Sequence, residues 1–284
     1  MDKPFRWNLA RQEQLGRLVE PRNPASPPDF LAELQRCCVR ILARAGDAEL
    51  FFVGRSPENM FDYLSGTLAG TAWAARCSMI NVSLYERSLA ELRAMSPDTL
   101  PAIRAQLAAA GLGPDQIRRR GYPTALVDLV SQGSTFGALV ELWLDWARGS
   151  GGDAAGIRRR LRFVGITRRQ KTSPKTWRWQ QHAPWAGQFQ PGMIKNISID
   201  ADLWRYLAND QPKVEPSNPP WRWTQAGLAL PRDEKTLAAL QGALDLYRLG
   251  QSPEHRRAFA SLMAREQTAM RAAWFRALAG EIRG

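Results

Sequence analysis

The sequence predicts an α/β protein with a mostly parallel sheet flanked by helices, followed by a Trp/Pro-rich irregular region and C-terminal helices. Three observations predict this class. Short apolar runs alternate with amphipathic helical patterns over residues 48–170. The runs are continuous, as is typical of strands buried on both faces of a sheet. A chain of 284 residues with 44% apolar residues and 11 Trp is also long and apolar enough to bury a sizeable core.

The N-terminal part is expected to contain a proline-rich arm, a helix and the first two strands. Apolar spacing predicts the helix over residues 30–45, and the run at 49–54 predicts a buried strand. Ser56 is a good N-cap, so a second helix is expected to begin there and to run to about residue 75. Residues 79–85 read as the second strand.

The middle of the chain continues the alternation. A helix is expected over residues 96–111 and the third strand over 125–130. The next helix is predicted by an apolar stripe with charged residues opposite it. The stripe consists of Leu139, Leu142, Trp143 and Trp146. A flexible stop at 149–153 then precedes the fourth strand, expected at 161–167.

The alternation breaks after the fourth strand. Residues 168–192 are rich in Gln, Trp and Pro, a fifth strand is expected at 193–199, and helical patterns return from 233 onward. The C-terminal helices are either a cap on the core or a surface for a homodimer or another partner. The expected organisation is an N-terminal arm and helix (1–47), an α/β core (48–200), a Trp/Pro-rich segment (201–232) and a C-terminal helical cap (233–284).

Composition narrows the classes of function. Three cysteines and two histidines, His182 and His255, form neither a disulfide framework nor a zinc motif. No run approaches the ~18 apolar residues of a membrane span, and the charged N-terminus lacks the apolar stretch of a secretory signal, so a cytoplasmic protein without a membrane partner is expected. The net charge of +12 indicates an anionic partner or a solvated basic surface.

The most informative stretch follows the third predicted strand. Asp128 is expected at the strand end, where it would accept hydrogen bonds from sugar hydroxyls. Gly133 allows a ligand close to the backbone, and the next helix directs its first amides outward. Around this glycine lie polar side chains able to donate hydrogen bonds: Ser131, Gln132, Ser134 and Thr135. The pattern predicts a phosphate loop beside a carboxylate, although a capped turn between strand and helix would look alike.

On these residues the chain resembles the type I phosphoribosyltransferase family. The matching residues are the apolar run 125–127, Asp128 as the second acidic position, and 131–135 as the 5-phosphate loop. The resemblance covers about residues 48–170. It implies that Gly54, Arg55 and Ser56 bind pyrophosphate, that a mobile loop lies between Tyr85 and Tyr122, and that Arg118–Arg120 could reach the pyrophosphate. Val127 departs from the pattern, since the family has an acid there.

The resemblance implies a ligand and, less directly, a reaction. The ligand is 5-phosphoribosyl 1-diphosphate or a related nucleotide, with Mg²⁺ bridging its diphosphate. The reaction is displacement of pyrophosphate at C1, in which Asp128 is the candidate catalytic residue and the Trp-rich residues 168–223 are a candidate hood over an acceptor. The same fold also serves as a noncatalytic binder, and Val127 keeps that option open.

Binding of nucleotides or nucleic acid without catalysis is the second interpretation. The pI of about 10.3, the basic clusters at 118–120 and 158–171, and the interleaved tryptophans support it. An NTPase or phosphatase is disfavoured because the chain has no Gly-x4-Gly-Lys-Ser/Thr loop and no Asp-x-Asp at a strand end. A Ser-His-Asp hydrolase is disfavoured because the chain has no Gly-x-Ser-x-Gly motif at this turn.

Overall fold

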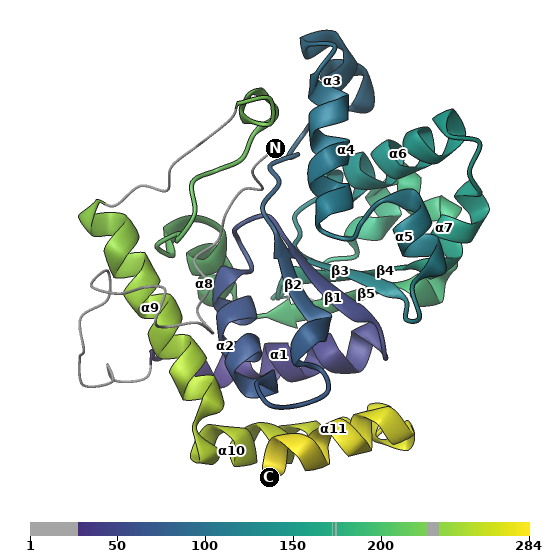
Figure 1. Ribbon diagram of the computed structural model, residues 1–284. Coiled ribbons are helices and arrows are strands. Elements are labelled where there is room, and N and C mark those ends of the chain that lie inside the picture. The colour runs from purple at the N-terminus through teal and green to yellow at the C-terminus, as the bar shows by residue number, and fades with distance from the viewer. Residues whose placement is uncertain (1–27, 172, 174, 226–232) are drawn as a thin grey trace.

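A five-stranded, entirely parallel sheet forms the centre of the molecule. The computed structural model describes residues 28–171, 173, 175–225 and 233–284, so the N-terminal arm at 1–27 lies outside the described residues. The strands are β1 (Glu49–Val53), β2 (Cys77–Ile80), β3 (Thr124–Leu129), β4 (Leu161–Arg168) and β5 (Ile194–Ile199). Their order is β2-β1-β3-β4-β5 (Figure 1). The predicted α/β class with a parallel sheet is confirmed.

Helices cover both faces of this sheet (Figure 1). On one face lie α1 (Leu31–Ala45), α2 (Glu58–Leu68), α10 (Pro253–Met263) and α11 (Ala273–Arg283). On the other face lie α3 (Leu89–Met95), α4 (Thr99–Ala109), α5 (Pro114–Arg119), α6 (Ser134–Gly149) and α7 (Ala154–Arg160). Two further α-helices, α8 (Ala201–Arg205) and α9 (Glu234–Gln251), complete the set of α-helices in the described part of the chain.

The alternation of side chains along a strand explains the two cores. In β1, Leu50 and Phe52 join the core under α1 and α2, whereas Phe51 and Val53 join the core under α4 and α6. Both cores are hydrophobic, so the strand sequence is continuously apolar, as the sequence pattern indicated.

The direction in which successive strands are added across the sheet reverses between β1 and β3. From β1 the chain moves outward to β2 by way of α2, and it then returns across β1 to β3 by way of α3–α5 on the opposite face. In open parallel sheets a crevice forms at such a reversal, beyond the carboxyl ends of the strands. The fold therefore places any ligand site between the loops that follow β1 and β3.

Two element boundaries differ from the sequence prediction for identifiable reasons. Helix α2 ends at Leu68 rather than near residue 75, because Gly70 adopts φ +75° and turns the chain out of the helix. The N-cap is Pro57, not Ser56. Strand β2 ends at Ile80, because Ile80 pairs with Val53, the last residue of β1, and no partner strand continues beyond it.

The C-terminal helices pack on the core. Phe259 of α10 and Phe275 of α11 are fully buried in the cluster that contains α1. Helix α9 packs closely on α2, where a Cβ at Gly66 or Gly250 would lie within 2.3 Å of a backbone oxygen of the other helix. Within the described residues no helix is long and apolar enough to cross a bilayer.

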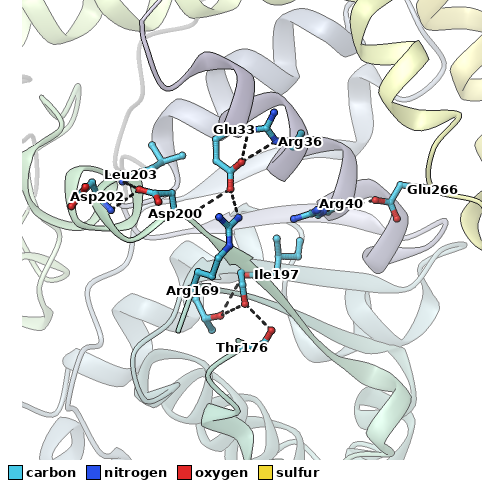
Figure 2. Close-up of polar contacts among 12 residues, drawn as sticks. Glu33, Arg36, Arg40, Arg169, Thr176, Ile197, Asp200, Asp202, Leu203 and Glu266 are labelled. Atoms are coloured by element: carbon cyan, nitrogen blue, oxygen red, sulfur yellow. Dashed lines mark hydrogen bonds and ion pairs between the residues drawn. The ribbon is translucent and has the colours of Figure 1, made fainter. Parts of the chain in front are cut away.

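A polar network ties α1 to the end of β4 and the start of α8 (Figure 2). The carboxylate of Glu33 accepts hydrogen bonds from Arg36 at 2.6 Å, from Arg169 at 2.7 Å and from the backbone N–H of Asp200 at 3.3 Å. Asp200 in turn caps α8 by accepting from the backbone N–H of Asp202 at 2.9 Å. We call this set the Glu33 network; it fixes the point at which the chain leaves β5, at the carboxyl edge of the sheet.

Candidate functional site

A cavity of about 470 Å³ lies at the carboxyl edge of the sheet, at the reversal between β1 and β3. Its size is within the range of ligand pockets. The loops after three strands and a later segment supply its walls. The lining residues of interest are Gly54, Arg55, Ser56, Tyr85, Asp128, Ser131, Gln132, Gly133, Ser134, Thr135, Trp204, Asn209 and Lys213. All nine candidate site residues from the sequence are thus in the wall of one cavity.

The loop after β3 has the geometry of an anion cradle. Gly133 adopts φ +78° and is the residue before α6, a helix of 16 residues. A left-handed residue at this position bends the chain so that the first amides of α6 face the cavity, where their partial positive charge attracts an anion. The backbone N–H of Glu86 lies 3.4 Å from the Ser134 hydroxyl, so the loop after β2 also borders the cradle.

Two buried tryptophans support this loop from behind. A Cβ added to Gly133 would lie 2.5 Å from ring carbons of Trp179, and one added to Gly137 would lie 2.7 Å from Trp185. The indole N–H of Trp185 also donates to the Gly133 carbonyl at 3.2 Å. Both rings belong to the core over β3 and β4, so they fix the shape of the loop rather than form a hood over a ligand.

Two other tryptophans border a neighbouring cavity of about 420 Å³. Trp177 is 36% exposed, and its indole N–H donates to the Ser131 carbonyl at 2.6 Å. Trp204 of α8 lines both cavities. Ser131 and Gln132 lie between the two cavities, and Arg168 is on the wall of the second one. Of the Trp-rich residues, Trp177 and Trp204 therefore border open space beside the loop.

The loop after β1 is held by the segment that follows α8. Gly54 adopts φ +73°, and its N–H donates to the Ile80 carbonyl at 2.9 Å. The side-chain amide of Gln211, which is 2% exposed, donates to the carbonyls of Arg55 at 3.1 Å and Ser56 at 2.6 Å. We call residues 206–223 the edge segment, because they lie along the carboxyl ends of β1 and β2.

Arg55 lies in this loop and lines the cavity. One guanidinium N–H donates to the Glu215 carbonyl at 3.1 Å. Burial lowers the pKa of Arg55 below its ordinary value, although Glu58 and Glu215 oppose that shift. A guanidinium has five N–H donors in a fork that matches phosphate oxygens. Arg55 can therefore bind a phosphate group while one donor holds the edge segment.

Asp128 is 8% exposed at the end of β3 and lines the cavity. Burial raises its pKa well above the ordinary value, while the backbone N–H of Leu129 and the charge of Lys213 act in the opposite direction. The preceding residue, Val127, points to the other face of the sheet and is fully buried in the core with Phe52 and Val164. The cavity thus receives one carboxylate from this strand.

Lys213 is a member of the site that the sequence did not predict. Its ammonium group donates to the carbonyl of Leu207 at 2.8 Å and lies 3.4 Å from that of Arg55. Burial lowers the pKa of Lys213 to about 8, the charge of Arg55 lowers it too, and Glu58 and Asp128 oppose the shift. Lysines and carboxylates with perturbed pKa values in one cleft are typical of functional sites.

The arginines at 118–120 do not reach this site. Arg120 forms an ion pair with Glu49, the first residue of β1, and donates to the Gly111 carbonyl, so it lies at the amino edge of the sheet. Arg118 pairs with Asp115 within α5, just before β3. The prediction that these residues contact pyrophosphate was therefore wrong. The expected mobile loop between Tyr85 and Tyr122 is mostly helix, as α3, α4 and α5, and only residues 82–86 border the cavity.

Several arginine side chains are bound to acidic side chains or backbone carbonyls of the same chain. Arg104 pairs with Asp145 at 2.9 Å. Arg160 donates to the Arg120 carbonyl, and Arg256 donates to the carbonyls of Ala69, Glu281 and Ile282. These contacts join helices and loops of the fold, so the net charge does not translate directly into a surface for a polyanion.

The protein side chains do not fit a resident divalent cation. Among the described residues no group of three or more His, Cys, Asp or Glu side chains could hold a metal ion. Asp128 is the single carboxylate among the described residues that line the cavity, and its buried position disfavours the charged form. Mg²⁺ in nucleotide sites uses one or two carboxylates together with the phosphates of the substrate. Any Mg²⁺ here would depend chiefly on the ligand.

Comparisons of the chain with protein-family profiles, with curated proteins and with solved structures give no match.

Proposed function

We propose that this protein binds a phosphorylated ribose, 5-phosphoribosyl 1-diphosphate or a related nucleotide, in the cavity at the reversal between β1 and β3. The observation that carries the proposal is the set of groups on that one cavity wall: a helix N-terminus, two cationic side chains and a buried carboxylate. This is the combination that a sugar with phosphate groups at both ends requires. The resemblance of residues 125–135 to the phosphoribosyltransferase signature supports the same ligand.

The positions of these groups suggest how the ligand would lie. The 5-phosphate would occupy the loop at 131–135, where the amides of α6 and the hydroxyls of Ser134 and Thr135 can donate to it. The ribose would lie against Asp128, whose carboxylate accepts from hydroxyl groups. The diphosphate would reach Gly54 and Arg55, where a guanidinium and a close-approach glycine are present.

Transfer of the phosphoribosyl group is the reaction this arrangement would serve. An acceptor would bond to C1 as the C1–O bond to pyrophosphate breaks, and the leaving group would be neutralised by cationic groups near Arg55. The adjoining cavity beside Trp177 and Trp204 shares Ser131 and Gln132 with this one, and we propose it as the side from which an acceptor would enter. Val127 does not supply a second carboxylate, so we propose binding as the primary property and transfer as its extension. Mg²⁺ would enter with the diphosphate, and we assign no step to it.

Calorimetry with 5-phosphoribosyl 1-diphosphate tests the proposal. Wild type should bind saturably, and Asp128→Asn should lose affinity at least about tenfold, because an amide NH₂ group, which can only donate, replaces one of the two carboxyl oxygens that would accept from the ribose hydroxyls. Asp115→Asn is the matched control, since Asp115 is exposed on α5 at the other edge of the sheet, and it should bind as wild type does.

Two results would count against the proposal in different ways. The absence of any binding heat with the wild-type protein would refute it. Equal binding by wild type and Asp128→Asn would leave a phosphate binder but remove Asp128 from the site. Binding of oligonucleotides that falls steeply with salt, with no response to the sugar diphosphate, would favour the nucleic-acid interpretation instead.

A further inference from the structure

Lys213 enters the cavity from a part of the chain far from the phosphate loop in sequence. It belongs to the edge segment and lines the cavity together with Arg55 and Asp128. Two of the three N–H groups of its ammonium are directed at the carbonyls of Leu207 and Arg55. A third donor remains for a ligand, because an ammonium group carries three and accepts none.

We infer that Lys213 supplies, from the protein itself, the positive charge that a divalent cation would otherwise bring to the diphosphate of the bound sugar, so that binding does not require Mg²⁺. This inference rests on the proposed function and specifies its electrostatics. It adds a binding residue to the site.

The first argument is the shortage of carboxylates. A protein-held cation needs anionic oxygen ligands, and among the described residues the cavity wall has only the carboxylate of Asp128. The same wall carries two basic side chains, Arg55 and Lys213. A site with this balance of charge attracts the anionic ligand directly and repels an additional free cation.

The second argument is that the position of the ammonium group is fixed by the surrounding chain. Next to it, Gln211 donates to the carbonyls of Arg55 and Ser56 and, at 2.8 Å, to that of Leu207. On the other side, the backbone N–H of Val214 donates to Glu58 at 3.0 Å. A charge held in place in this way stabilises an anion without reorganisation, which is the condition for strong electrostatic binding.

A purely structural role for Lys213 makes a different prediction. If the ammonium group only held the edge segment to Leu207, its loss would lower stability and would weaken every ligand of the cavity to the same degree. If it faces the diphosphate, its loss weakens a diphosphate ligand much more than a ligand with the 5-phosphate alone.

The test uses calorimetry on the full chain with two probes, 5-phosphoribosyl 1-diphosphate and ribose 5-phosphate, each in buffer with EDTA and in buffer with MgCl₂. For wild type the dissociation constant of the diphosphate should be equal within about threefold in the two buffers. In EDTA, Lys213→Met should weaken the diphosphate at least about tenfold and ribose 5-phosphate at most about threefold, whereas Lys213→Arg should stay within about threefold of wild type. Lys195→Met, near the amino end of β5, is the control and should leave both unchanged.

Each alternative outcome is decisive. If wild type binds the diphosphate with MgCl₂ but not with EDTA, or if Lys213→Met binds it as wild type does, the inference is overturned while the proposed function stands. Equal losses for both probes would assign Lys213 a structural role and also overturn it. If wild type binds neither probe in either buffer, the proposed function itself fails. If Lys213→Met does not fold, the dissociation constants of wild type for the diphosphate in EDTA and in MgCl₂ still test whether binding requires Mg²⁺.

Discussion

Glu33 and Asp128 are two largely buried carboxylates in contrasting electrostatic surroundings. Burial raises the pKa of Glu33, but hydrogen bonds and charges from Arg36, Arg169 and the Asp200 amide outweigh it and leave the pKa below its ordinary value. For Asp128, burial dominates and the pKa is raised well above its ordinary value. The nearby charge that favours ionised Asp128 is Lys213, whose own pKa is lowered to about 8.

The difference separates a structural carboxylate from the one that we propose binds a ligand. The Glu33 network supplies a close cationic partner to its carboxylate and faces other elements of the fold (Figure 2). The Asp128 site places one acidic and two basic side chains on the wall of a cavity, and burial disfavours the charged form of each of them. Such an arrangement costs stability, and it is maintained where an added ligand provides the missing partners.

The largest effect is expected at Gly133, where the loop packs tightly on Trp179. Gly133→Ala should lower the free energy of unfolding by about 3 kcal/mol, because alanine at φ +78° is strained and its Cβ would lie 2.5 Å from the buried ring of Trp179. Gly149→Ala, at the other end of the same helix and with no atom within 4 Å of its Cβ, should change stability by at most about 1 kcal/mol. Urea denaturation measures both. Equal stabilities would show that Trp179 does not constrain the loop.

A smaller effect is expected from the titration of Lys213. Affinity for 5-phosphoribosyl 1-diphosphate should fall by about twofold from pH 7 to pH 8 and then by up to about tenfold per pH unit, because the pKa of Lys213 is about 8 and we propose that its charged form binds the diphosphate. The phosphate monoester has a pKa of about 6 and is almost fully ionised throughout this range.

The charged groups around Lys213 require a control for this pH profile. Glu58, Arg55 and Asp128 all act on its ammonium group, and the raised pKa of Asp128 could itself reduce anion binding as pH rises. Lys213→Arg separates these causes, since a guanidinium stays charged to pH 12 or above. A flat profile for Lys213→Arg identifies Lys213, and a profile that still falls identifies Asp128.

The sequence predicted the sheet and the two loops because those features depend on local patterns. The apolar runs at β1, β3 and β4 are buried on both faces of the sheet, and continuous apolar residues are typical of strands in that position. Gly54 and Gly133 both adopt positive φ, so their identity already marked the turns. The end of β2 was missed because it depends on where β1, its pairing partner, stops.

Lys213 and the supporting tryptophans could not be found in this way. The edge segment has no periodic pattern, and its position is set by contacts more than 130 residues away, such as Gln211 with Ser56 and Asn218 with Asn81. Trp177 and Trp179 differ by two positions, yet one is part exposed at a cavity and the other is fully buried. Composition indicated that the region was aromatic, but only the tertiary structure decides which ring supports the loop.

The smallest effect is expected at the Glu33 network, where a substitution tests whether Glu33 acts only on the stability of the fold. Glu33→Gln should lower stability at pH 7 by about 0.5 kcal/mol, because Arg36 and Arg169 are both more than a third exposed and solvent screens their charges. Since the pKa of Glu33 is lowered in the folded protein, its contribution is present above its ordinary pKa of 4.5 and is lost as pH falls through the folded value. The stability difference between wild type and Glu33→Gln should therefore shrink towards zero below pH 4.5.

Urea denaturation at pH 7 and at acidic pH gives the measurement, with Glu266→Gln as the control, since that carboxylate makes a longer ion pair of 3.9 Å with Arg40. Affinity for 5-phosphoribosyl 1-diphosphate should stay within about twofold of wild type in Glu33→Gln, because the network contacts the fold rather than the cavity. A large loss of affinity without a loss of stability would mean that the attachment of α8, and through it Trp204, controls the ligand cavity. The Glu33 network and the cavity that contains Asp128 would then be energetically coupled.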